Sequence, residues 1–252
     1  MFLYSLYLDR YTEAQNVQTM GETSIEDLLK IDNISYGELP EYNAEMSYVT
    51  ADTSIFSKNE LKKFGNQEFT ISENTILYSK ISVPYKIKVV KGDYQFDDFL
   101  ADYVPYGKEY LLWEIVEEEQ FATFFQKVNQ YPIYFNQNAM LKIYWDDEGN
   151  ITNYEQQRFG DFDSFNKKKD ILSPLDVINT LYSRDYLKKG STVSSISLGY
   201  STLITLTKTQ VFAPTWRVRV ELKEGGFEDH FVNAIEGKIV EFQSELIEDD
   251  EE

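Results

Sequence analysis

Residues Ala213 to Phe242 read APTWRVRVELKEGGFEDHFVNAIEGKIVEF, and the prediction of the fold starts from this stretch. Gly225-Gly226 and Glu236-Gly237 each provide the residues that a tight turn needs. Apolar residues alternate with charged ones: Trp216, Val218, Val220 and Leu222 point one way, and Arg217, Arg219, Glu221 and Lys223 the other. A period of two is typical of a half-buried strand, so Trp216 is expected to be a core anchor. The stretch predicts a three-stranded antiparallel meander, and nothing in it looks catalytic.

The composition is that of a folded, strand-rich protein of one large domain or two small ones. The chain has 252 residues, of which 42% are hydrophobic, and its 19 Tyr and 17 Phe favour strands over helices. The 43 acidic residues outnumber 24 basic ones, giving a net charge of −19. Such a surface repels phosphate backbones, so the sequence argues against a nucleic-acid partner.

Several classes of catalytic site lack the residues they need. The chain has no cysteine, which excludes disulfides, thiolate nucleophiles and cysteine metal sites. It has one histidine, His230, so a Ser-His-Asp triad or a two-histidine metal site has almost no material. Paired carboxylates for glycoside hydrolysis do not stand out among so many acidic residues. We therefore assign no catalytic, cofactor-binding or metal-binding residue and expect no enzyme.

The first 20 residues are expected to form a membrane-proximal segment or linker. Phe2 to Leu8 is apolar and aromatic, and it is too short to cross a bilayer, which takes about 20 residues. It also lacks the basic start and cleavage site of a signal peptide. Two interpretations remain: an ordinary start of a strand or helix, or the outer end of a transmembrane helix with interfacial Tyr4 and Tyr7.

Residues 21–162 are expected to form an N-terminal α+β domain. Thr23 with Glu26, and Ser57 with Glu60, match the capping box of a short helix. Pro84 places the strands of residues 69–88 at a sheet edge. A further helix is expected over residues 96–104. Strands are expected over residues 46–49, 110–116, 120–128, 132–135, 140–145 and 151–158, and their short connections favour an antiparallel sheet.

Residues 170–244 are expected to form a second, C-terminal α+β domain. The polar segment from Gly160 to Lys169 is interpreted as the boundary between the domains. Ser173, Pro174 and Asp176 then supply the cap, first turn and acidic residue that start a helix. The acidic tail, residues 245–252, is expected to be a solvated end. The predicted fold is thus α+β, with two small domains, each a twisted antiparallel sheet packed with short helices.

Three groups of residues are candidates for a site, and each has a simpler structural explanation. His230 is expected to be a solvent-facing strand residue rather than a pH switch or ligand. The dense aromatic residues could form a groove for a partner, although core packing explains most of them. A calcium loop is matched at Asp146, Glu148, Gly149 and Glu155, but Tyr144 at its first position cannot supply a carboxylate, so a hairpin turn is preferred. The aromatic residues concerned are Tyr131, Tyr134, Phe135, Tyr144 and Trp145.

The order of several motifs resembles a known family. The stretch Trp216 to Ile239 resembles the C-terminal signature of PepSY-like modules of bacterial exported proteins. Together with residues 23–34 (TSIEDLLKIDNI) and the central Pro132-Ile133-Tyr134-Phe135-Asn136, it resembles the YycI family over nearly the whole chain. These motifs are signatures of a fold rather than of catalysis.

The resemblance implies a function that the residues alone do not. Members of the family have one N-terminal transmembrane helix and an extracytoplasmic two-domain region. They act with the related YycH protein on the WalK (YycG) sensor histidine kinase, which controls cell-wall homeostasis in Gram-positive bacteria, and have no enzymatic activity. The resemblance thus implies a single-pass protein of the cell membrane, with Phe2 to Leu8 as the outer end of the span. A homo- or heterodimer is compatible with it.

A second interpretation remains open: a wall-associated binding or peptidase-inhibitor module. The sequence does not identify the residues that contact a partner, nor whether the kinase is activated or inhibited.

Overall fold

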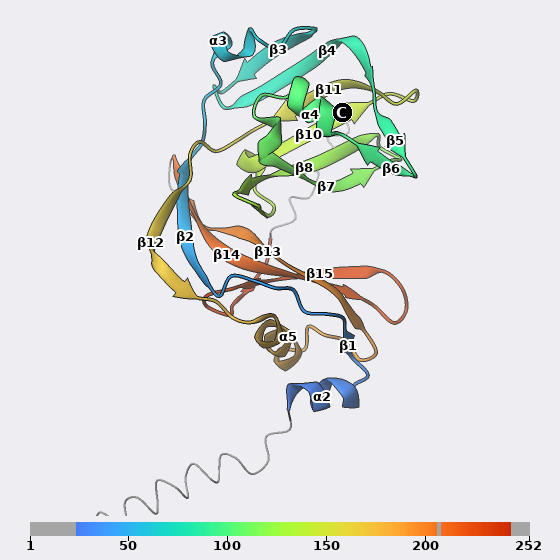
Figure 1. Ribbon diagram of the computed structural model, residues 1–252, viewed down its shortest axis with the longest axis vertical. Coiled ribbons are helices and arrows are strands. Elements are labelled where there is room, and N and C mark those ends of the chain that lie inside the picture. The colour runs from blue at the N-terminus through green and yellow to red at the C-terminus, as the bar shows by residue number, and fades with distance from the viewer. Residues whose placement is uncertain (1–23, 206–207, 243–252) are drawn as a thin grey trace, which may run out of the picture.

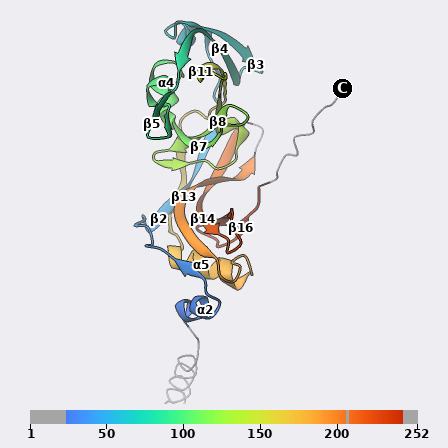
Figure 2. The same cartoon turned by 90° about the vertical axis from the view of Figure 1, so that its right-hand side faces the viewer.

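The computed structural model describes residues 24–205 and 208–242, and it shows an elongated molecule with one sheet above the other (Figures 1 and 2). Strands make up 51% of the described residues and helices 15%, which confirms the predicted α+β class with antiparallel sheets. None of the helices in these residues is long and apolar enough to cross a membrane. The segment Phe2 to Leu8 and the acidic tail lie outside the described residues.

The lower sheet is built around residues Ala213 to Phe242. Strand β14 (Thr209–Glu221) pairs antiparallel with β13 (Thr192–Thr205) and β15 (Phe227–Asn233), and β15 pairs with β16 (Ile239–Val240). The predicted meander is therefore confirmed. Trp216 is 1% exposed, and its indole Nε1–H donates to the Leu172 carbonyl at 3.0 Å, so it is the core anchor that was expected.

One face of the lower sheet is covered by helix α5 (Pro174–Ser183). Ser173 caps this helix as predicted: its hydroxyl accepts from the Asp176 N–H, and the Asp176 carboxylate accepts from the Ser173 N–H. The buried residues Val177, Ile178 and Leu181 pack against Trp216 and its neighbours. Burying about three such side chains contributes several kcal/mol, at roughly 1.5–3 kcal/mol each.

The lower sheet also contains strands from the N-terminal part of the chain. Strand β1 (Ser35–Tyr36) pairs parallel with β13, and β2 (Glu45–Asp52) pairs antiparallel with β14.

Helix α2 (Ile25–Ile31) precedes these strands and is capped by Ser24, not by Thr23 as the capping-box pattern suggested. The Ser24 hydroxyl accepts from the Asp27 N–H, so the pattern was displaced by one residue. Ser57 likewise caps α3 (Lys58–Leu61), by accepting from the Asn59 N–H rather than pairing with Glu60.

Residues Gly160 to Lys169, interpreted as the boundary between the domains, form most of a strand instead. This strand, β12 (Asp163–Asp170), pairs antiparallel with β2 on the edge of the lower sheet. All its side chains are exposed, so it lacks the alternation that reveals a half-buried strand. The sheets therefore divide the chain differently from the expected limits at 162 and 170, because residues 24–52 lie with the C-terminal half.

The upper sheet is formed by residues 67–156, in the order β3-β4-β11-β10-β8-β7. Its own core includes Leu77, Phe99, Phe124, Leu141 and Tyr154, and is separate from the core around Trp216. Most of the predicted strands are present, but of the strand expected over residues 132–135 only Pro132 lies in a strand, β9 (Tyr131–Pro132). The remaining elements are β3 (Gln67–Ser72), β4 (Ile76–Lys86), β5 (Lys88–Val90), β6 (Asp93–Gln95), α4 (Asp97–Asp102), η1 (Gly107–Glu109), β7 (Tyr110–Val116), β8 (Phe121–Val128), η2 (Gln137–Ala139), β10 (Met140–Trp145) and β11 (Asn150–Gln156).

Candidate functional site

The chain crosses between the two sheets twice, and the crossing segments are hydrogen-bonded to each other. One runs from β2 to α3 and the other from β11 to β12. The Ser54 N–H donates to the Arg158 carbonyl at 2.9 Å, and the Gly160 N–H donates to the Asp52 carbonyl at 2.9 Å. Two paired segments restrict relative movement of the sheets more than a single linker would.

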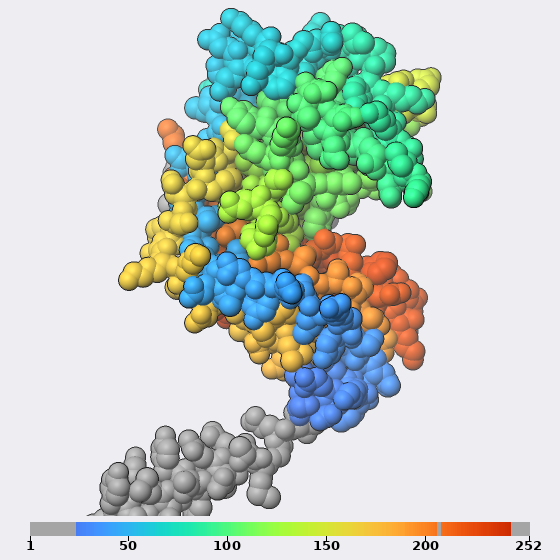
Figure 3. Space-filling view, in the orientation of Figure 1, coloured from blue at the N-terminus to red at the C-terminus, as the bar shows by residue number. Residues whose placement is uncertain are grey.

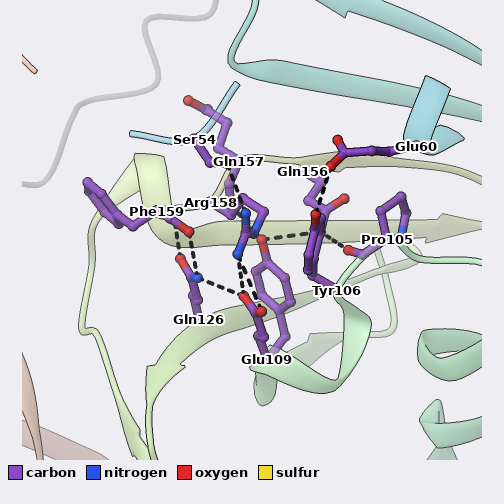
Figure 4. Close-up of polar contacts among 11 residues, drawn as sticks. Ser54, Glu60, Pro105, Tyr106, Glu109, Gln126, Gln156, Gln157, Arg158 and Phe159 are labelled. Carbon is purple, nitrogen blue, oxygen red and sulfur yellow. Dashed lines mark hydrogen bonds and ion pairs between the residues drawn. The ribbon is translucent and has the colours of Figure 1, made fainter. Parts of the chain in front are cut away.

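Arg158 is the centre of a polar network at this crossing (Figure 4). Its guanidinium donates to both oxygens of Glu109 at 3.0 and 3.3 Å and to the Ser54 hydroxyl at 2.8 Å. It also lies 3.8 Å from the centre of the Tyr106 ring, in cation–π geometry. The Arg158 side chain is 9% exposed and the Glu109 side chain 38%, so water screens the pair only in part.

Glutamine side chains extend the network into the upper sheet. The Gln126 amide donates to Glu109 and to the Phe159 carbonyl, and its oxygen accepts from the Phe159 N–H at 2.8 Å. The Gln156 amide donates to the Pro105 carbonyl at 2.6 Å. These hydrogen bonds hold the backbone where the chain leaves β11, and so they set the direction in which it enters the lower sheet.

The central segment Pro132 to Asn136 joins the sheets at a third place. The Tyr134 N–H donates to the Tyr200 carbonyl of β13 at 2.8 Å, and the Asn136 amide donates to Thr202 and Gln210 at 2.7 and 2.6 Å. Tyr134 lies against Gly199, where an added Cβ would come within 2.4 Å of the ring. Burial raises the pKa of Tyr134 to about 12. This motif therefore docks one sheet on the other, and only its first residue, Pro132, lies in a strand.

An aromatic groove opens beside this docking segment, where the two halves of the molecule meet. Figure 3 shows the upper half, mostly green, in contact with the orange part of the lower half. Its volume is about 440 Å³. Phe135 is 46% exposed, and its ring centre lies 4.7 Å from that of Phe242 and 5.6 Å from that of Phe231. The lining residues are Phe135, Tyr186, Asp229, His230, Phe231, Ile239, Val240, Glu241 and Phe242. Phe135 is the one predicted aromatic candidate that lines this groove.

Asp229 lies on the groove wall and is paired with two arginines. Burial would raise the pKa of Asp229, but hydrogen bonds from Arg217 and Arg219 outweigh it and hold the pKa below its usual value. The same Arg217 stacks 4.0 Å from the ring centre of Trp113 in β7, which links the lower sheet to the upper one. These residues form a rigid ion cluster of one carboxylate and two guanidinium groups.

His230 is not the solvent-facing residue that was expected. Its side chain is 14% exposed, packs edge-to-face on Tyr186, and places Nε2 3.6 Å from a Glu228 oxygen. That Nε2 is buried and has no hydrogen-bond partner. Burial lowers the pKa of His230, so its neutral form is favoured. The alternation pattern missed this because Tyr186, which covers the ring, is distant in sequence.

The other candidates are structural. Asp146 closes the β10–β11 hairpin by accepting from the Glu148 and Asn150 N–H groups at 3.1 and 2.8 Å, so the preferred hairpin turn is what forms. Within residues 24–205 and 208–242, no group of three His, Cys, Asp or Glu side chains could hold a metal ion. Tyr134 and Trp145 are buried, whereas Tyr131 and Tyr144 are half-buried.

The polar network around Arg158 was not predicted from the sequence. The signal that the sequence offers for it is the run Gln156-Gln157-Arg158, in which long polar residues end a strand.

Comparison with known proteins places this fold in a family. A family model described as YycI protein matches residues 12–235. The chain belongs to the YycI family. YycI is a regulatory family rather than a known enzyme family, and membership suggests a regulator of the YycG (WalK) kinase system.

Solved structures add information on the fold alone. The YycI chain is similar to the crystal structure of an uncharacterized protein from Eubacterium rectale ATCC 33656, at 15% sequence identity and a TM-score of 0.50. The likeness covers 84% of this chain and 92% of that one, so both sheets take part in it. No curated protein matches the sequence.

Proposed function

We propose that this YycI protein is an extracytoplasmic regulator that modulates a two-component sensor histidine kinase controlling cell-wall homeostasis. It acts through protein–protein contacts with the kinase and with a YycH-type partner, and catalyses no reaction. The observation that carries the proposal is the family match over residues 12–235, which includes both sheets and the junction between them. We also propose that the protein is held at the membrane by a single span, of which Phe2 to Leu8 is the outer end.

Tethering explains how contacts of modest strength can regulate. A span confines the protein and its partner to one surface, which raises their effective concentration, so a weak contact is well occupied. Part of the contact is expected in the span itself, because helix association in lipid depends on close packing and not on charge outside the membrane.

The test compares three proteins for co-purification with the kinase from membranes. They are the chain with its natural span, the same chain with a span of unrelated sequence, and a soluble chain starting at residue 24. We expect the first to retain the kinase well, the second less well, and the third weakly or not at all. Equal retention by the soluble chain would contradict a role for the span. Turnover of peptides or glycans by the purified chain would overturn the non-enzymatic function.

A further inference from the structure

The positive charge of the upper sheet is concentrated in one segment. Between residues 54 and 91 there are seven lysines and three acidic residues, although the whole chain has 43 acidic residues against 24 basic ones. This segment forms α3, β3, β4 and β5, at the top of Figure 1. At the other edge of the same sheet, β7 runs directly into Glu117-Glu118-Glu119. The excess of lysines lies in β4 and β5 and beside them, since residues 57–73, which include α3 and β3, hold three lysines and three glutamates.

A groove lies between α3 and β3, and the side chains that line it include two lysines and no acidic residue. Its volume is about 570 Å³. Leu61 is buried, and Phe69 and Ile71 pack partly against the upper core, so the groove has an apolar floor. Lys58 and Lys62 stand on its rim, exposed, and neither forms an ion pair in the part of the chain that the structure describes.

The β-strand that forms one wall of this groove has an unpaired edge. β3 pairs with β4 through residues Gln67 to Ser72, and no strand of the described residues pairs with its other side. An edge strand presents backbone N–H and C=O groups to any extended chain that comes alongside. Side chains of an added strand alternate, so one set would enter the apolar floor and the other would face the rim.

We propose that the groove between α3 and β3 binds an extended, acidic segment of a partner protein as an added strand. Its carboxylates pair with Lys58 and Lys62, and its apolar side chains contact Leu61, Phe69 and Ile71. Charge decides the class of partner: the unpaired lysines attract an acidic segment, and the strongly acidic remainder of the chain repels it from other surfaces. Binding of such a segment goes beyond the proposed function and does not depend on the identity of the kinase.

The test uses a fluorescent peptide of alternating glutamate and leucine, Glu-Leu-Glu-Ile-Glu-Leu-Glu, and the whole chain. We expect binding that weakens about tenfold in the K58E/K62E variant, where attraction becomes repulsion. The matched control is K167E/K168E, which changes the net charge equally through two exposed lysines of β12. Backbone amide signals of Gln67 to Ser72 should shift on titration, whereas those of β12 should not. Circular dichroism of each variant shows whether the fold is kept.

Each result of these measurements either supports or overturns binding of an acidic segment in the groove. Loss of binding in K58E/K62E alone, with shifts in β3, supports it. Equal loss in both variants shows a general charge effect and overturns it, as does absence of binding up to millimolar peptide. A peptide with glutamine in place of glutamate should bind about tenfold more weakly at low salt, and equal binding would overturn the role of charge. Binding to phosphatidylglycerol vesicles in place of the peptide would show that Lys58 and Lys62 recognise lipid instead.

Discussion

At the scale of single residues, Trp216 shows how one side chain holds the lower half of the molecule together. It is 1% exposed and packs with α5, so Trp216→Ala should lower the free energy of unfolding by about 3–5 kcal/mol. Trp216→Phe, which keeps most of the volume but not the hydrogen bond to Leu172, should cost less. Urea unfolding followed by circular dichroism measures both. An unchanged unfolding midpoint in Trp216→Ala would show that the side chain is not a core anchor.

The burial of His230 is expected to make the stability of the fold depend on pH. Burial lowers its pKa in the folded chain below 6.5, against the opposing effects of Glu228 and Asp229, while Lys188 adds to the lowering. As the pH falls through 6.5 the unfolded chain binds a proton first, so the free energy of unfolding declines until the folded pKa is passed. We expect His230→Gln to lose less stability than the wild type between about pH 7.5 and 5.5. Equal losses in urea midpoint would show that His230 does not contribute.

At the scale of elements, the alternation of side chains along the sequence predicted those strands whose burial follows the same alternation. Residues Tyr110–Val116 (β7) and Met140–Trp145 (β10) form strands with the predicted bounds. Alternate side chains of β10 are buried, and in the middle of β7 half-buried side chains alternate with exposed ones. β12 was missed because its side chains are all exposed and its pairing with β2 depends on residues more than a hundred positions away. For the same reason the sequence showed Phe135 as an aromatic candidate but not that Phe231 and Phe242 would join it in a groove.

Helix α5 provides a test of a predicted element. The Ser173 hydroxyl accepts from the Asp176 N–H, so Ser173→Ala should cost about 0.5–2 kcal/mol of stability by leaving that N–H without its cap. Ser183→Ala is the matched control, because the same substitution at the other end of α5 removes an exposed hydroxyl that donates to Asn179. Urea unfolding should separate the two variants. Equal midpoints would mean that the cap does not stabilise the helix.

At the scale of the whole molecule, the junction decides whether two separate cores behave as one unit. The family motif Pro132 to Asn136 was visible in the sequence, but its role in docking the sheets was not, since Gly199 and Tyr134 meet only in the folded chain. Three contacts converge there: the paired crossings, the docking segment, and Arg217 on Trp113. Packed side chains and hydrogen-bond networks of this kind can carry energetic coupling between two sites on different sheets.

Removal of Arg158 tests this coupling. Arg158→Met keeps much of the side-chain volume but deletes the hydrogen bonds to Glu109 and Ser54, each of which contributes about 1.5–3 kcal/mol when one partner is charged. Since Glu109 is partly exposed, water replaces some of that loss, and we expect each core to stay folded while the connection loosens. Protease should then cut residues 157–162 faster than in the wild type, and thermal unfolding should broaden toward two transitions. Arg184→Met, at the exposed end of α5, is the control and should leave both measurements unchanged. A single sharp transition and unchanged cleavage in Arg158→Met would show that the docking segment and the aromatic contacts couple the sheets without this network.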